Sequence, residues 1–430
     1  MKLKHLLTVS FLLIFVTKPV SALSLTDLTS SLTDAFASFV DENEGITSFH
    51  SLGIPVGGRA ESLGCAYTGL SDDISFFNYN PAASSLLKNT QISLFHNSWI
   101  ADSNMETIAF TSRIGNFGFG GQLQCFYIPF SEYNFFGEKT NSSYYTETTV
   151  AMNASYNFLA GYNFKGIAIG TSLKASYRGM PNFTDNDTNE VIKGSGFSQS
   201  GLGLMADVGL MFRFNFAKFY ASRDPNFRIG IAAQNLGVAI TGFGKQLELD
   251  DPLPTNVSVG ISYNFIKPVS ITIDFKQPLN LMNLSEYHLF TLGGGVQIQF
   301  TNFLAVLAGF QIKGGNPQIS LGAEFEIFKI RMNLNYTLDL TSSVNPVNRI
   351  SLAAKVQLGD KGRQALSDKI ATLYNTGVYY FSAGEYEMAI EVWEEVLELD
   401  KRYDPAILGI KSANAMLDMF RKIRESMFLE

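Results

Sequence analysis

The residue types that perform most enzyme chemistry are few in this sequence and are not grouped. Of its four histidines, His5 lies in a leader-like start, and His50, His96 and His288 are not at metal-ligand spacing. There is no Gly-x-Ser-x-Gly nucleophile elbow and no phosphate-binding loop. The sequence therefore predicts a protein that is not an enzyme and that needs no metal or cofactor.

The charge content narrows the class of protein further. Only 17% of the residues are charged, the net charge is −7, and the chain has 36 Phe and 18 Tyr. A negative chain lacks the basic surface that nucleic acid requires, so nucleic acid is excluded as a partner. A soluble domain typically carries about 25% charged residues, so the missing charge predicts an outer surface that faces lipid. The two cysteines, Cys65 and Cys125, either pair after export or stay free.

The first residues indicate the compartment. Lys2 and Lys4 precede an apolar run from Leu6 to Val16, and the small residues of Val20-Ser21-Ala22 follow. This is the pattern of a secretory signal peptide over residues 1–22, with an uncleaved membrane anchor as the alternative. No later stretch is apolar for the roughly 20 residues that a membrane-spanning helix needs, which excludes a helical inner-membrane protein.

From residue 90 to residue 358, apolar and polar residues alternate with a period of two. Residues 167–178, for example, set Ile169 and Leu173 on one face and Lys174 and Arg178 on the other. A soluble sandwich also alternates, but segments of ten residues or more fit tilted membrane strands. The polar faces are rich in Gly, Ser, Asn and Gln, as in a barrel interior. Aromatic residues near strand ends would form an interfacial girdle: Tyr127, Phe130, Tyr156, Phe158, Tyr263 and Phe265.

The alternation predicts an all-β transmembrane barrel of fourteen antiparallel strands. We expect them at residues 90–98, 104–113, 116–128, 144–158, 165–178, 201–216, 227–238, 255–265, 268–277, 287–300, 303–313, 317–327, 329–339 and 349–358. The connections between them are alternately long and short. In outer-membrane barrels the long loops lie outside the cell and the short turns in the periplasm, so both ends of the barrel should be periplasmic.

Several motifs add a family resemblance. Gly58-Arg59-Ala60, Ala66-Tyr67-Thr68 through Asp72-Asp73, and Asn80-Pro81-Ala82 resemble the N-terminal plug, or hatch, of FadL-like outer-membrane proteins, in particular the PorV/PorQ branch. Ala233-Gln234-Asn235-Leu236-Gly237 and Leu253-Pro254-Thr255 are similar to later motifs of that branch. The resemblance covers residues 50–358. It implies a fourteen-stranded barrel (90–358) closed by a hatch (23–89), with Asn80, Pro81 and Ala82 as the hatch motif.

The resemblance also implies a route for cargo. In FadL-like proteins a long-chain fatty acid enters from outside, passes the lumen as the hatch shifts, and leaves sideways at a kink in the third strand. That kink would fall between Asn116 and Gly121, so Gly118, Gly120 and Gly121 are the candidates for the lateral gap. Glycines weaken strand pairing and permit a bulge. Alternatively, these glycines only relieve crowding against the hatch.

A fatty-acid carboxylate requires a cation beside an apolar pocket. The candidates are Arg59 in the hatch and, on lumen faces of the strands, Lys174, Arg178, Arg213, Lys276, Arg331 and Lys355. The alternative is that these cations form salt bridges with lumen carboxylates, for which the sequence offers Asp207, Asp274, Glu324 and Glu326.

The end of the chain departs from the family pattern. The last strand ends at Leu358 without a terminal aromatic residue, so the assembly signal is internal or atypical. Residues 363–430 have helical periodicity and form a small α-helical domain. Six of them resemble a tetratricopeptide repeat: Gly377, Tyr380, Gly384, Tyr386, Ala389 and Trp393. Residues 404–425 add a third helix. This tail either binds a peptide or forms a capping hairpin or a dimer contact.

Two classes of function remain. One is the transport of a hydrophobic small molecule, such as a long-chain fatty acid, by a barrel set in outer-membrane lipid. The other is a PorV-like docking or assembly scaffold, in which residues 363–430 bind a protein partner in the periplasm. The hatch and the apolar barrel favour transport, whereas the tail favours a partner.

Overall fold

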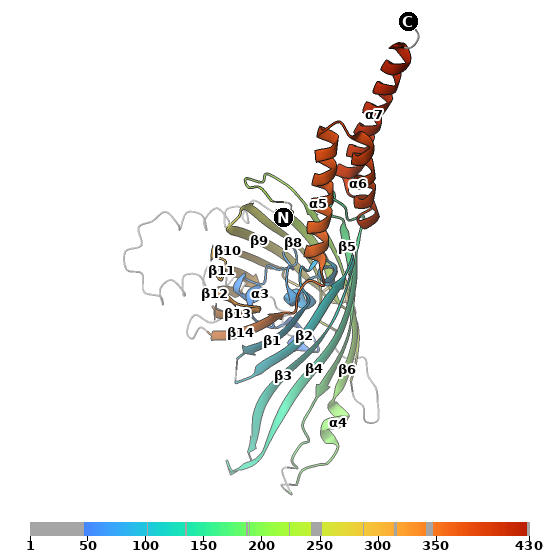
Figure 1. Ribbon diagram of the computed structural model, residues 1–430. Coiled ribbons are helices and arrows are strands. Elements are labelled where there is room, and N and C mark those ends of the chain that lie inside the picture. The colour runs from blue at the N-terminus through green and yellow to red at the C-terminus, as the bar shows by residue number, and fades with distance from the viewer. Residues whose placement is uncertain are drawn as a thin grey trace, which may run out of the picture.

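The computed structural model describes residues 47–427, except residues 101, 134–135, 186–187, 189, 223, 242–251, 287, 314–315 and 341–346. The predicted signal peptide and residues 23–46 of the expected hatch segment therefore lie outside the described residues. The described chain forms a barrel, a hatch inside it and a helical tail at one end (Figure 1).

The barrel is a single closed antiparallel sheet. Each strand pairs with its neighbours in the chain, and β1 (Gln91–Ser98) closes the ring on β14 (Val347–Gln357), from Gln91 opposite Gln357 to Ser98 opposite Ile350. Over the described residues there are fourteen strands, as predicted. The others are β2 (Asn104–Ile114), β3 (Phe117–Tyr133), β4 (Lys139–Phe158), β5 (Ile167–Gly179), β6 (Gly201–Phe214), β7 (Phe227–Thr241), β8 (Thr255–Ile266), β9 (Val269–Leu279), β10 (Thr291–Thr301), β11 (Leu304–Lys313), β12 (Asn316–Ile327) and β13 (Ile330–Asp339).

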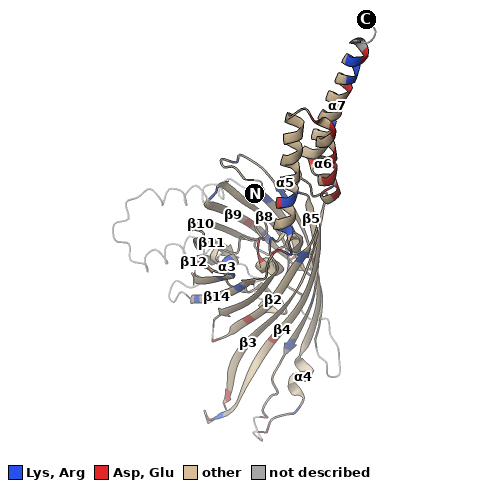
Figure 2. Cartoon of the chain, in the orientation of Figure 1, with Lys and Arg blue, Asp and Glu red and all other residues tan. Residues whose placement is uncertain are grey.

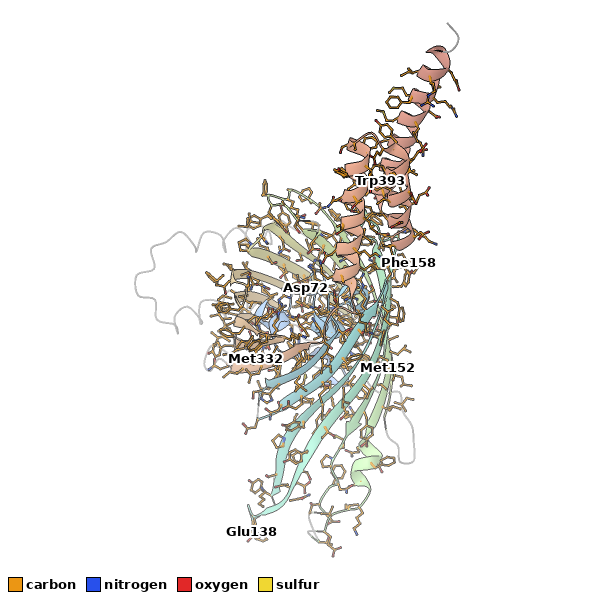
Figure 3. All side chains as sticks on the ribbon, in the orientation of Figure 1. Asp72, Glu138, Met152, Phe158, Met332 and Trp393 are labelled. Atoms are coloured by element: carbon orange, nitrogen blue, oxygen red, sulfur yellow. The ribbon has the colours of Figure 1, made fainter. Side chains whose placement is uncertain are left out.

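The alternation in the sequence becomes an apolar outer face and a polar inner face. On β4, Asn153 and Ser155 are buried inside, whereas Met152 is 70% exposed. Figure 3 shows Met152 and Met332 pointing away from the barrel on different parts of the wall. The outer wall turned to the viewer carries few charges (Figure 2). Among the described residues, none of the helices combines the length and apolar character needed to cross a bilayer.

The hairpin of β3 and β4 extends beyond the rest of the wall, at the end of the barrel opposite the tail (Figure 1). The sequence predicted a loop over residues 129–143, but β3 continues to Tyr133 and β4 starts at Lys139. From Ile128 on, β3 pairs with β4 and not with β2. The prediction was wrong because this part of the hairpin has no core to face, so its sequence loses the two-residue alternation. Glu138 lies at its tip (Figure 3).

The hatch fills the inside of the barrel with short helical turns: η3 (His50–Gly53), α3 (Arg59–Ser62), η4 (Ile74–Asn78) and η5 (Pro81–Leu86). Tyr67, Phe76 and Phe77 are fully buried there. Strand glycines make room for it, since a Cβ on any of them would lie 2.0–2.5 Å from a hatch atom: Gly118, Gly170, Gly209, Gly230, Gly260, Gly295 and Gly309. Side chains at these positions would exclude the hatch backbone.

The tail consists of three helices, α5 (Arg363–Ser382), α6 (Tyr386–Leu399) and α7 (Asp404–Met427). Gly384, with φ of 85°, makes the turn between α5 and α6. The tail stands at the short-turn end of the barrel (Figure 1) and is docked on the β4–β5 turn. There the N–H of Tyr162 donates to the carbonyl of Arg402 (3.2 Å) and the Tyr162 ring meets Tyr403 edge-on (4.8 Å).

Candidate functional site

Four of the seven candidate cations are held by carboxylates. Lys174 lies 2.7 Å from Asp207 across the β5–β6 pair. Three further pairs are Arg331 with Glu326, Arg59 with Asp72, and Lys355 with Asp73. Sequence reasoning named Asp207 and Glu326 as partners but missed both hatch aspartates. Of the other two carboxylates it named, Glu324 lies 3.6 Å from Arg331, and Asp274 accepts the backbone N–H of Thr68 in the hatch (2.5 Å).

A third hatch carboxylate was also missed by sequence reasoning. Glu61 accepts hydrogen bonds from Ser351 of β14 (2.7 Å) and Thr337 of β13 (3.1 Å). Arg349 lies 3.8 Å from Glu61 and pairs with Asp339 at 2.7 Å. Burial raises the pKa of Glu61, although Arg349 and these hydrogen bonds act against the rise. The hatch is thus tied by charged and polar groups to the last two strands.

The two adjacent aspartates of the hatch behave differently from Glu61. Burial alone would raise the pKa of Asp73, but Lys355 and Arg59 hold it well below its usual range. The pKa of Asp72 is likewise lowered, because Arg59 and Arg228 outweigh its burial. Both aspartates are therefore charged, and their partners neutralise them inside the barrel. Figure 3 places Asp72 within the ring of strands.

Among the described residues, the other three candidate cations are not paired with a carboxylate. Arg213 donates to the carbonyl of Lys165 (3.3 Å). Lys276 lies over the ring of Tyr79, with 5.7 Å from its Nζ to the ring centroid. Arg178 lies over the ring of Phe49 at 5.9 Å, and its Nε is buried without a hydrogen-bond partner. In the described part of the chain, Arg178 thus keeps a buried donor that a ligand could use.

Arg178 borders an apolar cluster. Phe49, Met205, Ala239 and Leu253 are buried together, with Leu52 packed against them. We call this cluster and Arg178 the Arg178 site. Glu147 lies directly across from Arg178 in the β4–β5 register, but it accepts the backbone N–H of Ser51 (2.9 Å) and the Tyr145 hydroxyl instead. A cation beside buried apolar side chains is the arrangement that an amphipathic anion requires.

The hatch motif fastens the hatch to the wall. The Asn80 side chain donates to the carbonyls of Thr68 (3.1 Å) and Leu210 on β6 (3.0 Å), and it accepts the N–H of Ala82 (3.1 Å). Pro81 is the first residue of η5. A backbone N–H at that position has no partner within the helix, so its absence in proline removes no hydrogen bond. The carbonyl of Pro81 accepts from Asn153 on β4 (2.9 Å). The motif therefore shapes one turn and ties it to two strands.

Between Asn116 and Gly121, where the resemblance implied a kink, the pairing of β3 with both neighbouring strands shows no register shift. The pairing of β2 with β3 runs without a register shift from Asn104 opposite Tyr127 to Ile114 opposite Phe117. A Cβ on Gly118 would lie 2.1 Å from the carbonyl carbon of Ser84, and one on Gly120 would lie 2.9 Å from Phe77. Gly121 has no such neighbour within 3.4 Å. At the first two positions the glycines admit the hatch, which is the alternative that the sequence left open.

A bulge is found instead in β7, within the motif Ala233-Gln234-Asn235-Leu236-Gly237. The register with β6 shifts between Ala206 and Val208, and Asn235 has φ of 56°. The N–H of Asn235 donates to Asp207 (2.8 Å), and Lys174 donates to the Asn235 side chain (3.0 Å). The pair of Lys174 and Asp207 thus stabilises this bulge, so the Lys174 ammonium group already has partners within the protein.

The tail contains an apolar pocket of about 450 Å³. It lies over Trp393, whose ring is contacted closely by Gly377 and Gly409. Tyr374, Val378, Phe381 and Leu408 form much of the lining, and Asn163 of the β4–β5 turn closes the barrel side. Of the other residues singled out as tetratricopeptide-like, Ala389 is buried in the same core, and Tyr380 and Tyr386 pack against it.

The two cysteines are both free. Cys65 is buried in the hatch, and Cys125 is on β3 with its side chain partly exposed. Of the two outcomes that the sequence left open, the structure gives the unpaired one.

Comparison with known proteins gives one family and several similar folds. Residues 24–361 match the "Uncharacterised protein family (UPF0164)". A UPF0164 protein of Treponema pallidum (strain Nichols) is 27% identical over 391 residues, or 89% of this chain and 86% of that protein. A second from the same organism is 26% identical over 406 residues, or 92% and 81%.

Among solved structures, the toluene transporter TodX of P. putida is 12% identical, with a TM-score of 0.46, covering 70% of this chain and 98% of that one. A FadL homologue of Pseudomonas aeruginosa is 11% identical, with a TM-score of 0.40 over 69% and 97%. At these scores the barrel is established by the strand register of this chain and not by the likeness.

Proposed function

The chain belongs to the uncharacterised protein family UPF0164, and we propose that it is an outer-membrane transport protein for a long-chain fatty acid or a similar hydrophobic molecule. The apolar outer face of the closed barrel supports a place in lipid, because a barrel leaves no unpaired strand edge in the hydrocarbon. The tail and the short turns would lie in the periplasm, and the tall β3–β4 hairpin outside.

The Arg178 site is the observation that carries the proposal. An alkyl carboxylate needs apolar contacts for its chain and a donor for its head group. Phe49, Met205 and Leu253 supply the contacts, and the buried Nε of Arg178 is a donor without a partner. Four other candidate cations are already neutralised by carboxylates. Of the remaining three, Arg178 is the one that has a buried donor without a partner among the described residues, which supports it as the residue that holds the head group.

Passage beyond this site requires the hatch to move. The hatch fills the lumen, and its backbone lies so close to the wall glycines that a Cβ on them would clash with it. A sideways exit near Gly118, Gly120 and Gly121 would need the continuous β2–β3 hydrogen bonds to break there. We infer that cargo first displaces the hatch and that any lateral opening at β3 follows from the loss of hatch contacts.

Oleate binding to the purified protein in lipid nanodiscs tests the proposal. We expect Arg178→Met to weaken binding about tenfold or more, because a charged hydrogen-bond partner is lost, and Arg178→Lys to retain part of the affinity. Arg213→Met is the matched control, since Arg213 is also a lumen cation without a carboxylate but lies far from Phe49 along the strand. Equal effects of the two Met variants, or no oleate binding at all, would contradict the proposal.

The scaffold alternative rests on the tail. The exposed side of α6 carries a row of carboxylates, Glu387, Glu391, Glu394, Glu395 and Glu398, which is visible in Figure 2. Such a face supports a PorV-like role in which a basic periplasmic protein binds residues 363–430. Deleting those residues should then remove a co-purifying partner while oleate binding stays intact. Lost oleate binding with no lost partner would count against the scaffold.

A further inference from the structure

The apolar pocket of the tail lies where a molecule leaving the barrel would meet the periplasm. We propose that this pocket is a second binding site for the hydrocarbon chain of the cargo, which it receives at the short-turn end of the barrel. This inference rests on the proposed transport function, and it deepens that function by adding a receiving site outside the barrel.

The chemistry of the pocket favours a hydrocarbon chain. Its lining residues include no charged side chain, and the exposed Val378 of α5 and Leu408 of α7 line it together with Trp393 of α6. The volume of about 450 Å³ lies within the range of roughly 300–1,000 Å³ of small-molecule sites. The pocket is therefore apolar and large enough to hold part of an aliphatic chain.

An extended peptide fits this lining less well. A peptide brings a backbone donor and an acceptor with almost every residue, and these need partners when buried. In the lining, the Ser412 hydroxyl already donates to the carbonyl of Leu408 (2.9 Å) and the Trp393 indole N–H to the carbonyl of Tyr374 (3.2 Å). This leaves few polar side chains in the lining for a peptide backbone, chiefly Asn163 and Tyr374. A hydrocarbon chain has no donor or acceptor that needs a hydrogen-bond partner.

The pocket is continuous with the contact between tail and barrel. Ring contacts run from Phe381 to Trp393 (5.8 Å), on to Tyr374 (6.2 Å) and Tyr403 (5.5 Å), and from there to Tyr162 on the β4–β5 turn (4.8 Å). The N–H of Asn163 donates to Asp404 at 3.1 Å. These contacts hold the pocket at the rim of the barrel, and Figure 3 shows Trp393 on the same side as Phe158 at the end of β4.

The two tryptophans of the chain, Trp99 and Trp393, allow a direct test. In a Trp99→Phe variant, all tryptophan fluorescence comes from Trp393 beneath the pocket. Bromine atoms quench tryptophan fluorescence at short range, so dibromostearate is the probe, added to full-length protein in lipid nanodiscs. We expect saturable quenching of Trp393.

Matched surface variants separate the pocket from the surrounding bilayer. Leu408→Lys and Val378→Lys place a charge in the lining, whereas Ile407→Lys and Tyr379→Lys place it on the adjacent exposed residue, which is outside the lining. All four positions are at the surface, so folding should be retained, which circular dichroism checks. We expect at least a tenfold weaker quenching affinity for the first two variants and no change for the other two. Equal quenching in all four would mean that the probe acts from the bilayer, and it would overturn the inference.

The same protein also reports on the proposed function, through the Arg178-dependent binding of oleate. Such binding without saturable quenching of Trp393 would overturn the pocket inference and leave the barrel proposal standing, with a protein as the remaining occupant of the pocket. Quenching without Arg178-dependent binding would remove the link between pocket and barrel and so overturn the inference as stated. Failure of both measurements would overturn both proposals.

Discussion

The ammonium group of Lys355, on the strand that closes the barrel, is paired with the carboxylate of Asp73 in the hatch, and both side chains are almost completely buried. Arg59 lies 3.9 Å from the same carboxylate. The pair spans 282 positions of the sequence. It joins the plug to the last barrel strand by charge, in addition to the packing of Phe76 and Phe77.

Breaking this pair on one side should destabilise the protein. Lys355→Met leaves the Asp73 carboxylate buried with less compensation, and removing one partner of a buried pair costs about 3–5 kcal/mol. The free energy of unfolding, measured by urea titration in nanodiscs, should fall by that order. Lys329→Met, in the exposed turn before β13, should leave it unchanged. A double variant with Asp73→Leu should recover most of the loss, and no recovery would contradict the pairing argument.

Acid should loosen the hatch through its two aspartates. The folded protein holds the pKa of Asp72 and of Asp73 below the ordinary value of 3.8, so their charged forms stabilise the fold. That stability is complete above the ordinary value and is lost as the pH falls below it. The thermal midpoint should therefore drop between pH 5 and pH 2.5. An Asp73→Asn variant should start lower and drop less, and an identical drop would show that other groups are responsible.

Two neighbouring glycines of β3 should respond differently to the same substitution. Gly118→Val forces a side chain into the backbone at Ser84, whereas Gly121→Val has room. Overpacking costs about 1–3 kcal/mol, so the thermal midpoint should fall for Gly118→Val alone. If these glycines served a lateral gap without packing on the hatch, both variants would impair oleate uptake equally and neither would lose stability.

The buried thiol of Cys65 should report whether the hatch is seated. Burial, helped by Glu61, raises its pKa from the ordinary 9.0 to about 11, which lowers the reactive thiolate fraction about 100-fold at neutral pH. In a Cys125→Ser background, maleimide should label the native protein slowly. Adding Lys355→Met should speed the labelling, because the hatch loses its tie to β14. Fast labelling of the native protein would show that the hatch opens freely.

The barrel was predictable from the sequence because an apolar outer face and a polar inner face toward the hatch require a strict two-residue period. That period placed Lys174, Arg178 and Arg331 on the inner face without any structure. The period could not predict strands where it ends. The far end of the β3–β4 hairpin extends beyond the rest of the wall, so its sequence does not alternate and was predicted to be a loop.

The partners of the inner charges were less predictable. Asp207 lies opposite Ser172 in the β5–β6 register, near enough to Lys174 for strand pairing to suggest the contact. Asp73 and Glu61 lie in a hatch without periodic structure, and their partners on β13 and β14 are hundreds of residues away. The glycines of β3 were ambiguous because a bulge and a close backbone approach require the same residue type. Only the position of Ser84 and Phe77 distinguishes the two.

The tight fit between hatch and wall also constrains how the molecule is made. Because Tyr67, Phe76 and Phe77 are buried and the wall glycines lie in contact with the hatch backbone, we expect the hatch to be in place before the ring of strands closes. The sheet would then curl around the hatch, and the pairing of β1 with β14 would form last. One of these two strands, β14, carries Ser351 and Lys355, which donate hydrogen bonds to the hatch carboxylates Glu61 and Asp73. Biogenesis would therefore never pass through a hollow pore, and the membrane would stay sealed while the protein is inserted.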